Sequence, residues 1–417
     1  MASQSTAPIG EWRRGWTLVL AASVGFSFFS VMSATNGVFM APLEREFGWN
    51  RTMQSSGTSI AAIYTALLSP FFGVLIDRIG TRRLALPGLV GTILVIAAIA
   101  QATGVKWQWF VLWSLFGLIS LCVKSTVWTA AVAGMFEHGR GLALGLTLSG
   151  TAVATSIAPP LANWMIENYG WRWAMTAMAL GWGGLALLLC MPFLYDAHDH
   201  RKRDAASGTT ATRLPDASGL TIPQALRDSA LWRIALTTFV MMVLTIGLQS
   251  NLQRMLTDQG FSSANAAWAT SIMGVTGIVG KLATGWLLDR YRPNWVGGVT
   301  LAITAIAFWL LFAMAGSVTA VLVAIAVNGY AAGTKIQIAG FLTTRYGGLR
   351  NFGAIFGAMA SLIAIGSGLG GFAAGQVFDR TGNYDLFFIA GVIGSVLCGL
   401  IIISLPLYPK WVKAEAG

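Results

Sequence analysis

The sequence is an almost unbroken series of long apolar stretches separated by short charged breaks. A transmembrane helix needs about 20 mostly apolar residues, because the hydrocarbon core of a bilayer is about 30 Å thick. A chain of 417 residues with this pattern has room for about twelve such helices. Only 10% of the residues are charged, against about 25% in an average soluble protein. We therefore expect an all-α membrane protein.

The apolar stretches predict two sets of six spans with a polar segment between them. The spans are expected at residues 16–41, 53–76, 84–103, 107–135, 141–166 and 173–194, then at 231–255, 264–288, 295–315, 318–344, 352–377 and 384–408. The segment between the sets carries charged residues and a Ser/Thr/Gly/Ala stretch, which is typical of a solvated linker. The predicted parts are an N-terminal half (1–195), a cytoplasmic linker (196–229) and a C-terminal half (230–417). Residues 221–229 of the linker are expected to form a short interfacial helix.

Basic residues outside the spans lie mainly in alternate loops, which sets the orientation. If the N-terminus is inside, the outside loops hold only Arg45, Arg51, Lys106, Arg172, Arg254 and Arg380. The inside regions then hold Arg13, Arg14, Arg78, Arg82, Arg83, Arg140, Arg201, Lys202, Arg203, Arg213, Arg227, Arg233, Arg290, Arg292, Arg345, Arg350, Lys410 and Lys413. This bias predicts a multi-pass protein of the inner (plasma) membrane with both termini in the cytoplasm. The net charge of +11 is spread over loops, so we expect no nucleic-acid partner.

Two landmarks in the first half return in the second. Residues 73–83 (GVLIDRIGTRR) follow the second span, and residues 285–292 (GWLLDRYR) follow the eighth, 212 positions later. Residues 140–145 (RGLALG) open the fifth span, and residues 350–357 (RNFGAIFG) open the eleventh, 210 positions later. The nearly equal offsets indicate that helices 7 to 12 repeat helices 1 to 6, giving two pseudo-symmetric halves.

The run at residues 73–83 resembles the loop 2-3 signature of the major facilitator superfamily, and the resemblance covers essentially the whole chain. It implies a major facilitator fold with a closure between the halves. The glycine permits close helix approach, and the Asp77 carboxylate can pair with arginines or face a helix N-terminus at the closure. The alternative is that the arginines only enforce topology. The expected gating residues are Asp77, Arg78, Arg82, Asp289, Arg140 and Arg350.

Within that superfamily, four stretches are similar to the monocarboxylate and oxalate/formate porter group. These stretches are Phe47–Arg51, Phe136–Gly150, Tyr169–Arg172 and Ala225–Trp232. The chain departs from the group in helix 1, where Trp12 to Trp16 only partly resembles the monocarboxylate signature and no lysine follows within the membrane.

Three lysines, Lys124, Lys281 and Lys335, lie well inside predicted spans. Each costs about 2.5 to 3.5 kcal/mol at a helix centre, and no Asp, Glu or His lies deep in any predicted span. We therefore expect the three lysines to line a polar cavity, where an anionic ligand would neutralise their positive charge. Lys124 and Lys335 are 211 residues apart, the repeat offset, so we expect them to face each other at mid-membrane. The family resemblance implies that Lys281 stands where the porters place a substrate-binding arginine. The alternative for Lys281 is snorkelling or structural pairing between helices, and the same alternative applies to Lys124 and Lys335, which lie deeper.

Five further residues are candidates to line the cavity. Trp128 is one turn from Lys124, and Asn328 is two turns from Lys335, so each pair is expected to share a helix face. Asn36, Tyr64 and Gln249 can supply hydrogen bonds. Plain helix packing is the alternative for all five.

These features predict a secondary active transporter that moves a small organic anion, a monocarboxylate or an aromatic carboxylate, by alternating access. We expect uptake, coupled to protons or to anion exchange, by a monomer in the lipid bilayer. The alternatives are a multidrug or metabolite exporter of the same fold and a transporter-like membrane sensor. The chain has no nucleophile and base set, metal cluster or phosphate loop, so we expect no enzyme activity, cofactor or metal.

Overall fold

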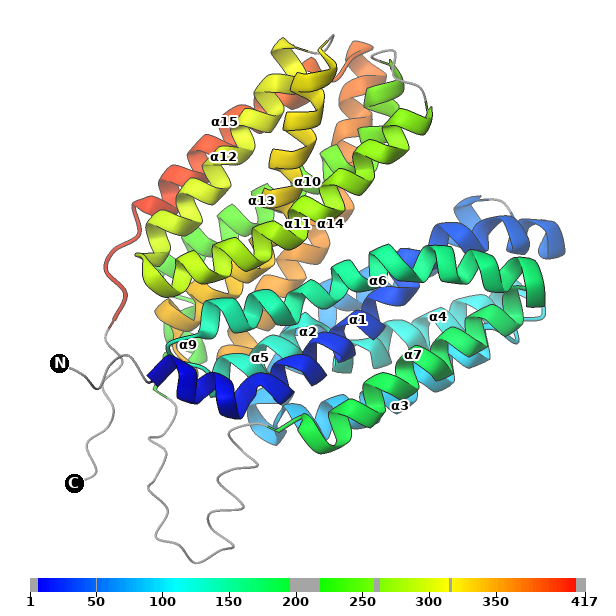
Figure 1. The fold of residues 1–417 in the computed structure, drawn as a ribbon, viewed down its shortest axis with the longest axis horizontal. Coiled ribbons are helices and arrows are strands. Elements are labelled where there is room, and N and C mark those ends of the chain that lie inside the picture. The colour runs from blue at the N-terminus through cyan, green and yellow to red at the C-terminus, as the bar shows by residue number, and fades with distance from the viewer. Residues whose placement is uncertain (1–6, 50, 196–217, 259–262, 315–316, 410–417) are drawn as a thin grey trace, which may run out of the picture.

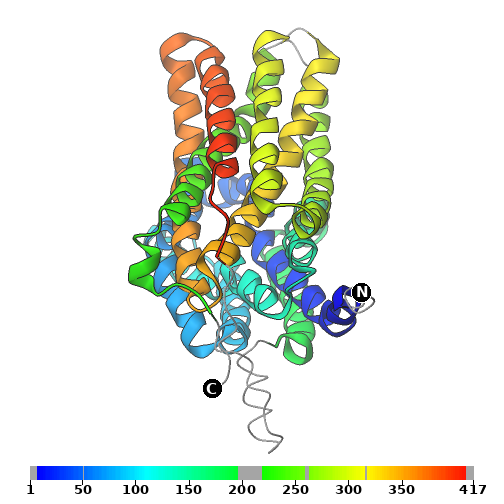
Figure 2. The same cartoon turned by 90° about the vertical axis from the view of Figure 1, so that its left-hand side faces the viewer.

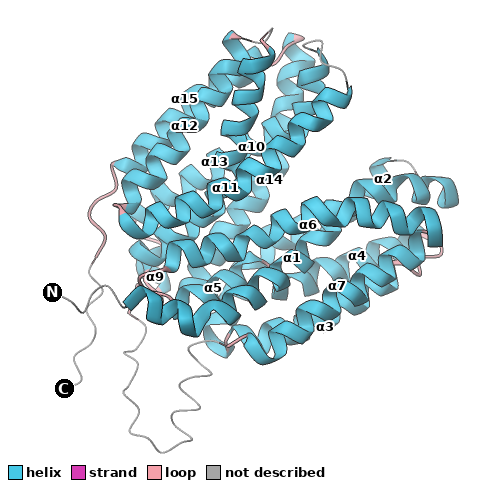
Figure 3. Cartoon of the chain, viewed as in Figure 1, coloured by secondary structure: helices cyan, strands magenta, loops and turns pink. Residues whose placement is uncertain are grey.

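The computed structural model describes residues 7–49, 51–195, 218–258, 263–314 and 317–409. Within these ranges the regular elements are helices, and the only β-type pairing is an isolated bridge between Gly219 and Gly348 (Figure 3). Eleven of the described helical segments are long and apolar enough to cross a membrane. Helix α11 (Ser263–Arg290) stands where the eighth span is expected and completes the series of twelve. The all-helical membrane fold is confirmed.

The N-terminal half follows the expected order of spans. It contains α1 (Ala7–Phe47), α2 (Arg51–Ile79), α3 (Thr81–Ile99), α4 (Lys106–Ser120), the 3-10 turn η1 (Leu121–Val123), α5 (Ser125–Met135), α6 (Arg140–Tyr169) and α7 (Trp171–Phe193). Two elements differ from the prediction. Helix α1 begins nine residues earlier than the expected span, and the fourth span is broken into α4, η1 and α5, with Lys124 in an extended conformation at the break.

The C-terminal half is built in the same way but without a break. It contains α10 (Ser229–Asp258), α11, α12 (Pro293–Ala313), α13 (Val318–Gly347), α14 (Phe352–Thr381) and α15 (Asp385–Ile403). The predicted interfacial helix is a single turn, α9 (Ile222–Ala225), whose start is stabilised by a capping box between Thr221 and Gln224. Linker residues 196–217 lie outside the described residues.

The two halves form two bundles that meet at one end and diverge toward the other (Figure 1). Viewed from the side where they meet, the bundles lie one above the other with α9 beside them (Figure 2). We call the end where the two bundles meet the closed end, and the end where they diverge the far end. The closed end is made by α2 against α14 and by α6 against α11. These are pseudo-equivalent pairs, as the repeat predicts.

Glycines permit the closest helix contacts at the closed end. A Cβ atom added at Gly73 of α2 would lie 2.0 Å from the carbonyl oxygen of Gly353 of α14, and one at Gly141 of α6 would lie 2.4 Å from that of Gly285 of α11. No larger residue fits there without separating the backbones. In membranes, where lipid supplies no hydrophobic drive between helices, such small residues allow the close packing that holds helices together.

Candidate functional site

Asp77, at the end of α2, binds the N-terminus of a helix from the other half. Its two carboxylate oxygens accept hydrogen bonds of 2.8 Å from the backbone N–H groups of Gly353 and Ala354, in the first turn of α14. These N–H groups have no partner inside their own helix, and the positive end of the helix dipole favours a carboxylate. Of the two roles considered for Asp77, the structure therefore displays the helix N-terminus contact.

Asp289 makes the pseudo-equivalent contact from α11 to α6. Its carboxylate accepts hydrogen bonds from the N–H groups of Gly141 (2.6 Å) and Leu142 (2.9 Å). Nearby, the amide of Gln337 in α13 donates to the carbonyl oxygen of Gly141 at 2.8 Å. Each half thus contributes one carboxylate and one helix N-terminus to the closed end, and the two contacts are related by the internal repeat.

The arginines assigned to the gate have different surroundings. Arg140 is buried, donates to the carbonyl oxygen of Phe136 at 2.7 Å, and reaches Thr344 of the other half at 3.3 Å. Arg82 donates to the carbonyl oxygen of Met191, which ties α3 to α7 within the N-terminal half. The side chains of Arg78 and Arg350 are exposed.

Lys281 connects the two halves farther into the molecule. Its ammonium group donates to the carbonyl oxygen of Leu148 at 2.9 Å and to the hydroxyl of Thr151 at 2.8 Å, both in α6. Lys281 lies two turns before Asp289 on α11, a rise of about 12 Å, and its residue exposure is 9%. The side chain therefore points between the halves at depth and does not snorkel to the closed end.

Lys124 lies at the break in the fourth span. Its ammonium group donates to the hydroxyl of Thr65 in α2 and lies 5.2 Å from the ring centroid of Phe29 in α1, within cation-π range. Breaks of this kind in transmembrane helices occur where the irregular backbone is enclosed by protein or lines a cavity. The sequence showed the lysine but gave no signal for the break.

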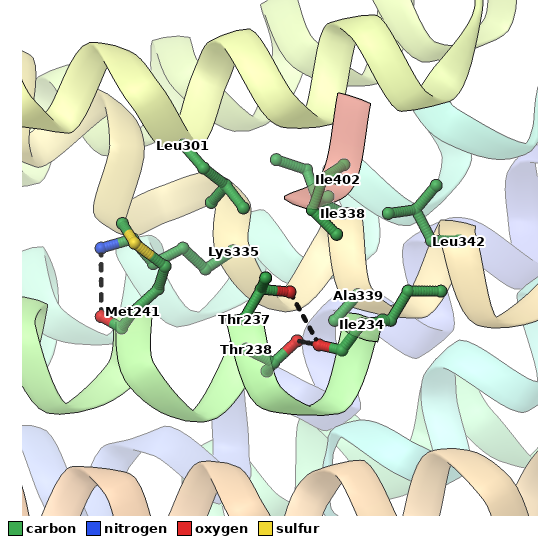
Figure 4. Close-up of a pocket in the computed structure, with 10 residues that line it drawn as sticks. All are labelled: Ile234, Thr237, Thr238, Met241, Leu301, Lys335, Ile338, Ala339, Leu342 and Ile402. Atoms are coloured by element: carbon green, nitrogen blue, oxygen red, sulfur yellow. Dashed lines mark hydrogen bonds between the residues drawn. The ribbon is translucent and has the colours of Figure 1, made fainter. Parts of the chain in front are cut away.

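Lys335 lies inside the C-terminal half. Its residue exposure is 3%, and its ammonium group is 3.4 Å from the carbonyl oxygen of Met241 in α10. Figure 4 shows it at a small cavity whose lining comes only from α10, α12, α13 and α15. The remaining lining residues are Ile234, Thr237, Thr238, Leu301, Ile338, Ala339, Leu342 and Ile402.

The expectation that Lys124 and Lys335 face each other across one cavity is therefore wrong for this structure. Equivalent positions in a repeat place the two residues on equivalent spans. They do not place the two ammonium groups in equivalent surroundings, because one span is broken at its lysine and the other is continuous. The lysine that reaches from one half to the other is Lys281.

The five further candidates differ in their surroundings. Trp128 is fully buried, donates to the carbonyl oxygen of Val123 at 2.7 Å, and its ring fills the space beside Gly25. Asn328 is buried between α13 and α11, where its amide nitrogen lies 3.5 Å from the sulfur of Met273.

The oxygen of the Asn328 amide has no hydrogen-bond partner among the described residues. Asn36 is half-buried, and Gln249 is exposed. Tyr64 is half-buried, and its ring packs beside Gly117 of α4. Asn328 and Trp128 thus lie within the packed halves, whereas Gln249 is accessible.

The sequence pattern of the Major Facilitator Superfamily matches residues 20–333 and 234–417. The chain belongs to this superfamily. As a member of it, the protein is a membrane transporter and not an enzyme. The paired helix N-terminus contacts at the closed end are thus contacts between the two halves of a major facilitator protein.

Similar proteins include monocarboxylate transporter 13 of Rattus norvegicus, 24% identical over 97% of this chain and 92% of the relative. The gallate transporter of Pseudomonas putida is 24% identical over 87% of this chain and 88% of the relative. Among solved structures, the human organic anion transporter MFSD10 aligns with a TM-score of 0.69 and 19% identity, covering 94% of this chain and 99% of the other. The E. coli fucose:proton symporter FucP aligns with a TM-score of 0.69 and 18% identity, covering 92% and 96%.

Several residues at these contacts were missing from the sequence prediction. Thr65, Thr151 and Thr344 each accept a hydrogen bond from a basic side chain of another helix. A threonine inside an apolar span carries no sequence signal for such a role, since most threonine hydroxyls here bond the carbonyl of their own preceding turn, as Thr92 does with Gly88. Only the arrangement of helices distinguishes them.

Proposed function

We propose that this major facilitator protein carries a small organic anion, a monocarboxylate or an aromatic carboxylate, by alternating access. Its relatives include proteins named as transporters of monocarboxylates and of gallate, and a similar fold is found in a protein named as an organic anion transporter. These names describe those proteins, and the argument for this chain rests on its own charges.

The observation that carries the proposal is the position of Lys281. Its ammonium group lies between the halves and donates only to neutral oxygens in the described contacts. Among the described residues no Asp or Glu is buried. A buried ammonium group without a carboxylate is costly, and a bound carboxylate would supply both the opposite charge and the acceptor oxygens. We therefore place Lys281 in the substrate site.

Lys124 is the second candidate for that site. It lies at a helix break in the N-terminal half, beside the Phe29 ring and the Thr65 hydroxyl. A cationic group next to an aromatic face suits a ligand with a carboxylate and an apolar body. Lys335 is not placed in the site, because its surroundings belong to the C-terminal half alone.

The closed end and the far end of the two halves indicate how the alternating-access cycle would proceed. We infer from the distribution of basic residues that the closed end faces the cytoplasm, so that this conformation opens outward. Transport then requires the Asp77 and Asp289 contacts to separate while the far ends of the two halves come together. We propose uptake across the inner (plasma) membrane by a monomer, with protons or a counter-anion as the coupling partner.

The test is uptake of radiolabelled carboxylates by proteoliposomes that contain the purified protein. We expect saturable uptake of at least one monocarboxylate or aromatic carboxylate, and none in liposomes without protein. Runs with and without a pH gradient separate proton coupling from exchange against a preloaded anion. Uptake of lipophilic cations with none of any carboxylate would overturn the proposal in favour of a drug exporter.

A further inference from the structure

The first turns of α1 are hydrogen-bonded to the loop that precedes α6. The Glu11 carboxylate accepts hydrogen bonds from the backbone N–H groups of Glu137 (3.3 Å), His138 (3.1 Å) and Gly139 (3.2 Å). It also lies 3.2 Å from Nδ1 of His138. Three successive N–H groups that converge on one oxygen-bearing group form a backbone anion nest, and here the nest is filled by a side chain of the same half.

Packing strengthens this contact. The rings of Trp12 and Phe136 lie 5.2 Å apart. A Cβ atom added at Gly139 would lie 2.7 Å from Nε1 of Trp12, and one added at Gly15 would lie 2.5 Å from the Phe136 ring. The start of α1 and residues 136–139 are therefore packed together as one unit.

That unit leads directly into the closed-end contacts. Arg140, the next residue, donates to the carbonyl oxygen of Phe136 and reaches Thr344 of the other half. The N–H groups of Gly141 and Leu142 then bind Asp289. A displacement of residues 136–139 would thus turn these N–H groups away from the Asp289 carboxylate.

The C-terminal half has a counterpart made of backbone. Leu220 N–H donates to the carbonyl oxygen of Gly347, and Leu349 N–H donates to that of Ser218, both at 2.9 Å. The side-chain amide of Asn351 donates to the carbonyl oxygen of Leu220 at 2.8 Å. Helix α14, which receives Asp77, begins at the next residue.

The two arrangements occupy equivalent places in the repeat. Leu220 follows Glu11 by 209 residues, and Leu349 follows Gly139 by 210 residues, matching the 210-residue offset of the helix starts. In the N-terminal half the start of the first long helix contacts the loop before the fifth helix, and in the C-terminal half the segment before the first long helix does so. The N-terminal half uses a carboxylate for this and the C-terminal half uses an antiparallel bridge.

We propose that these two segments are positioning elements of the closed end, and that Glu11 is the positioning residue of the N-terminal half. By fixing residues 136–139, Glu11 keeps the N-terminus of α6 aimed at Asp289. Residues 218–220 do the same for α14 and Asp77. The proposal goes beyond the proposed function, since it holds whatever the substrate is.

The test measures how often the closed end opens, with a cysteine at position 69 as the reporter. Ser69 of α2 is 4% exposed, and its carbonyl oxygen would lie 2.5 Å from a Cβ atom at Gly357 of α14, so it is covered by the other half. Ser69→Cys is made in full-length protein whose three native cysteines, Cys122, Cys190 and Cys398, are replaced by Ala. The rate of maleimide labelling of the purified protein is then measured.

We expect Glu11→Ala to raise the labelling rate about 10-fold, the change produced by a free-energy shift of about 1.4 kcal/mol in the opening equilibrium. Glu11→Gln should give a smaller increase, because its amide oxygen can still accept a hydrogen bond. The matched control is Glu44→Ala, which removes an exposed carboxylate from the other end of the same helix and should label at the parent rate.

A second arm tests the C-terminal half without touching α1. Asn351→Ala removes the amide that binds Leu220 and should raise the labelling rate of the cysteine at position 69 as Glu11→Gln does. The proposal is overturned if Glu11→Ala and Asn351→Ala both label at the parent rate. It is also overturned if they lower the unfolding temperature without a change in labelling at a temperature where the protein is folded, because that result means plain structural support.

Discussion

The Lys281 ammonium group donates a 2.8 Å hydrogen bond to the Thr151 hydroxyl and so joins the two halves between α11 and α6. The acceptor in this contact is a neutral oxygen. A substrate carboxylate could take its place and would be a stronger acceptor, because it carries a negative charge. Binding of an anion at Lys281 would therefore change a contact between the halves. If the proposed substrate site includes Lys281, this contact would couple substrate binding to the separation of α11 from α6.

The first prediction concerns that charge. Lys281→Gln should weaken the binding of the carboxylate found by the uptake screen about 10-fold to 150-fold, because a hydrogen bond to a charged group contributes about 1.5 to 3 kcal/mol. Lys281→Arg keeps the charge and should bind more tightly than Lys281→Gln. Titration calorimetry of the purified variants measures both. Lys106→Gln, at an exposed lysine, is the control, and equal affinity of Lys281→Gln and parent would remove Lys281 from the site.

The second prediction separates Lys335 from Lys281. Lys335→Met should change substrate affinity by less than about 3-fold, since its ammonium group lies within the C-terminal half. It should leave the unfolding temperature unchanged or raise it, because replacing a buried ionic group by an apolar side chain of similar volume is often neutral or stabilising. Binding titration and thermal unfolding in detergent test this. A loss of affinity as large as that of Lys281→Gln would mean that Lys335 contacts the substrate in another conformation.

The third prediction concerns Asp77. Asp77→Asn should leave substrate binding measurable but slow transport. The asparagine keeps only one of the two acceptor oxygens that bind the α14 N-terminus, and it loses the negative charge that the helix dipole favours. Initial uptake rates at equal protein content give the result. Asp379→Asn, at an exposed carboxylate near the opposite end of α14, should transport at the parent rate. A normal rate for Asp77→Asn would refute the gating assignment.

The fourth prediction uses two glycines of α14. A Cβ atom at Gly353 would lie 2.4 Å from the carbonyl oxygen of Gly73 and 2.7 Å from the Asp77 carboxylate, whereas one at Gly375 would meet nothing within 4 Å. Gly353→Ala should weaken the closed end by about 1 to 3 kcal/mol, the usual cost of overpacking. Gly375→Ala should be silent. Labelling of a cysteine at position 69 would show the difference as faster reaction in Gly353→Ala alone, and equal rates would contradict it.

Much of the architecture could be read from the chain because it depends on local properties. The length of each apolar stretch determined where the chain crosses the membrane, since lipid rewards about 20 apolar residues wherever they occur. The equal offsets between the glycine and aspartate motifs determined the repeat. With the resemblance to the superfamily, they marked Asp77 and Asp289 as gating candidates, and they left open whether Asp77 pairs with arginines or faces a helix N-terminus.

The tertiary structure alone decided which buried groups meet. Sequence spacing places Lys124 and Lys335 at equivalent positions, but the surroundings of each ammonium group depend on neighbouring helices and on a break in the fourth span. Glu11 and Thr151 accept hydrogen bonds from residues 126 and 130 positions away in the chain. The sequence by itself therefore determined the spans, the repeat and the charged candidates, and only the packing of helices decided which of those charges lie between the halves, because side-chain surroundings are set by neighbours remote in sequence.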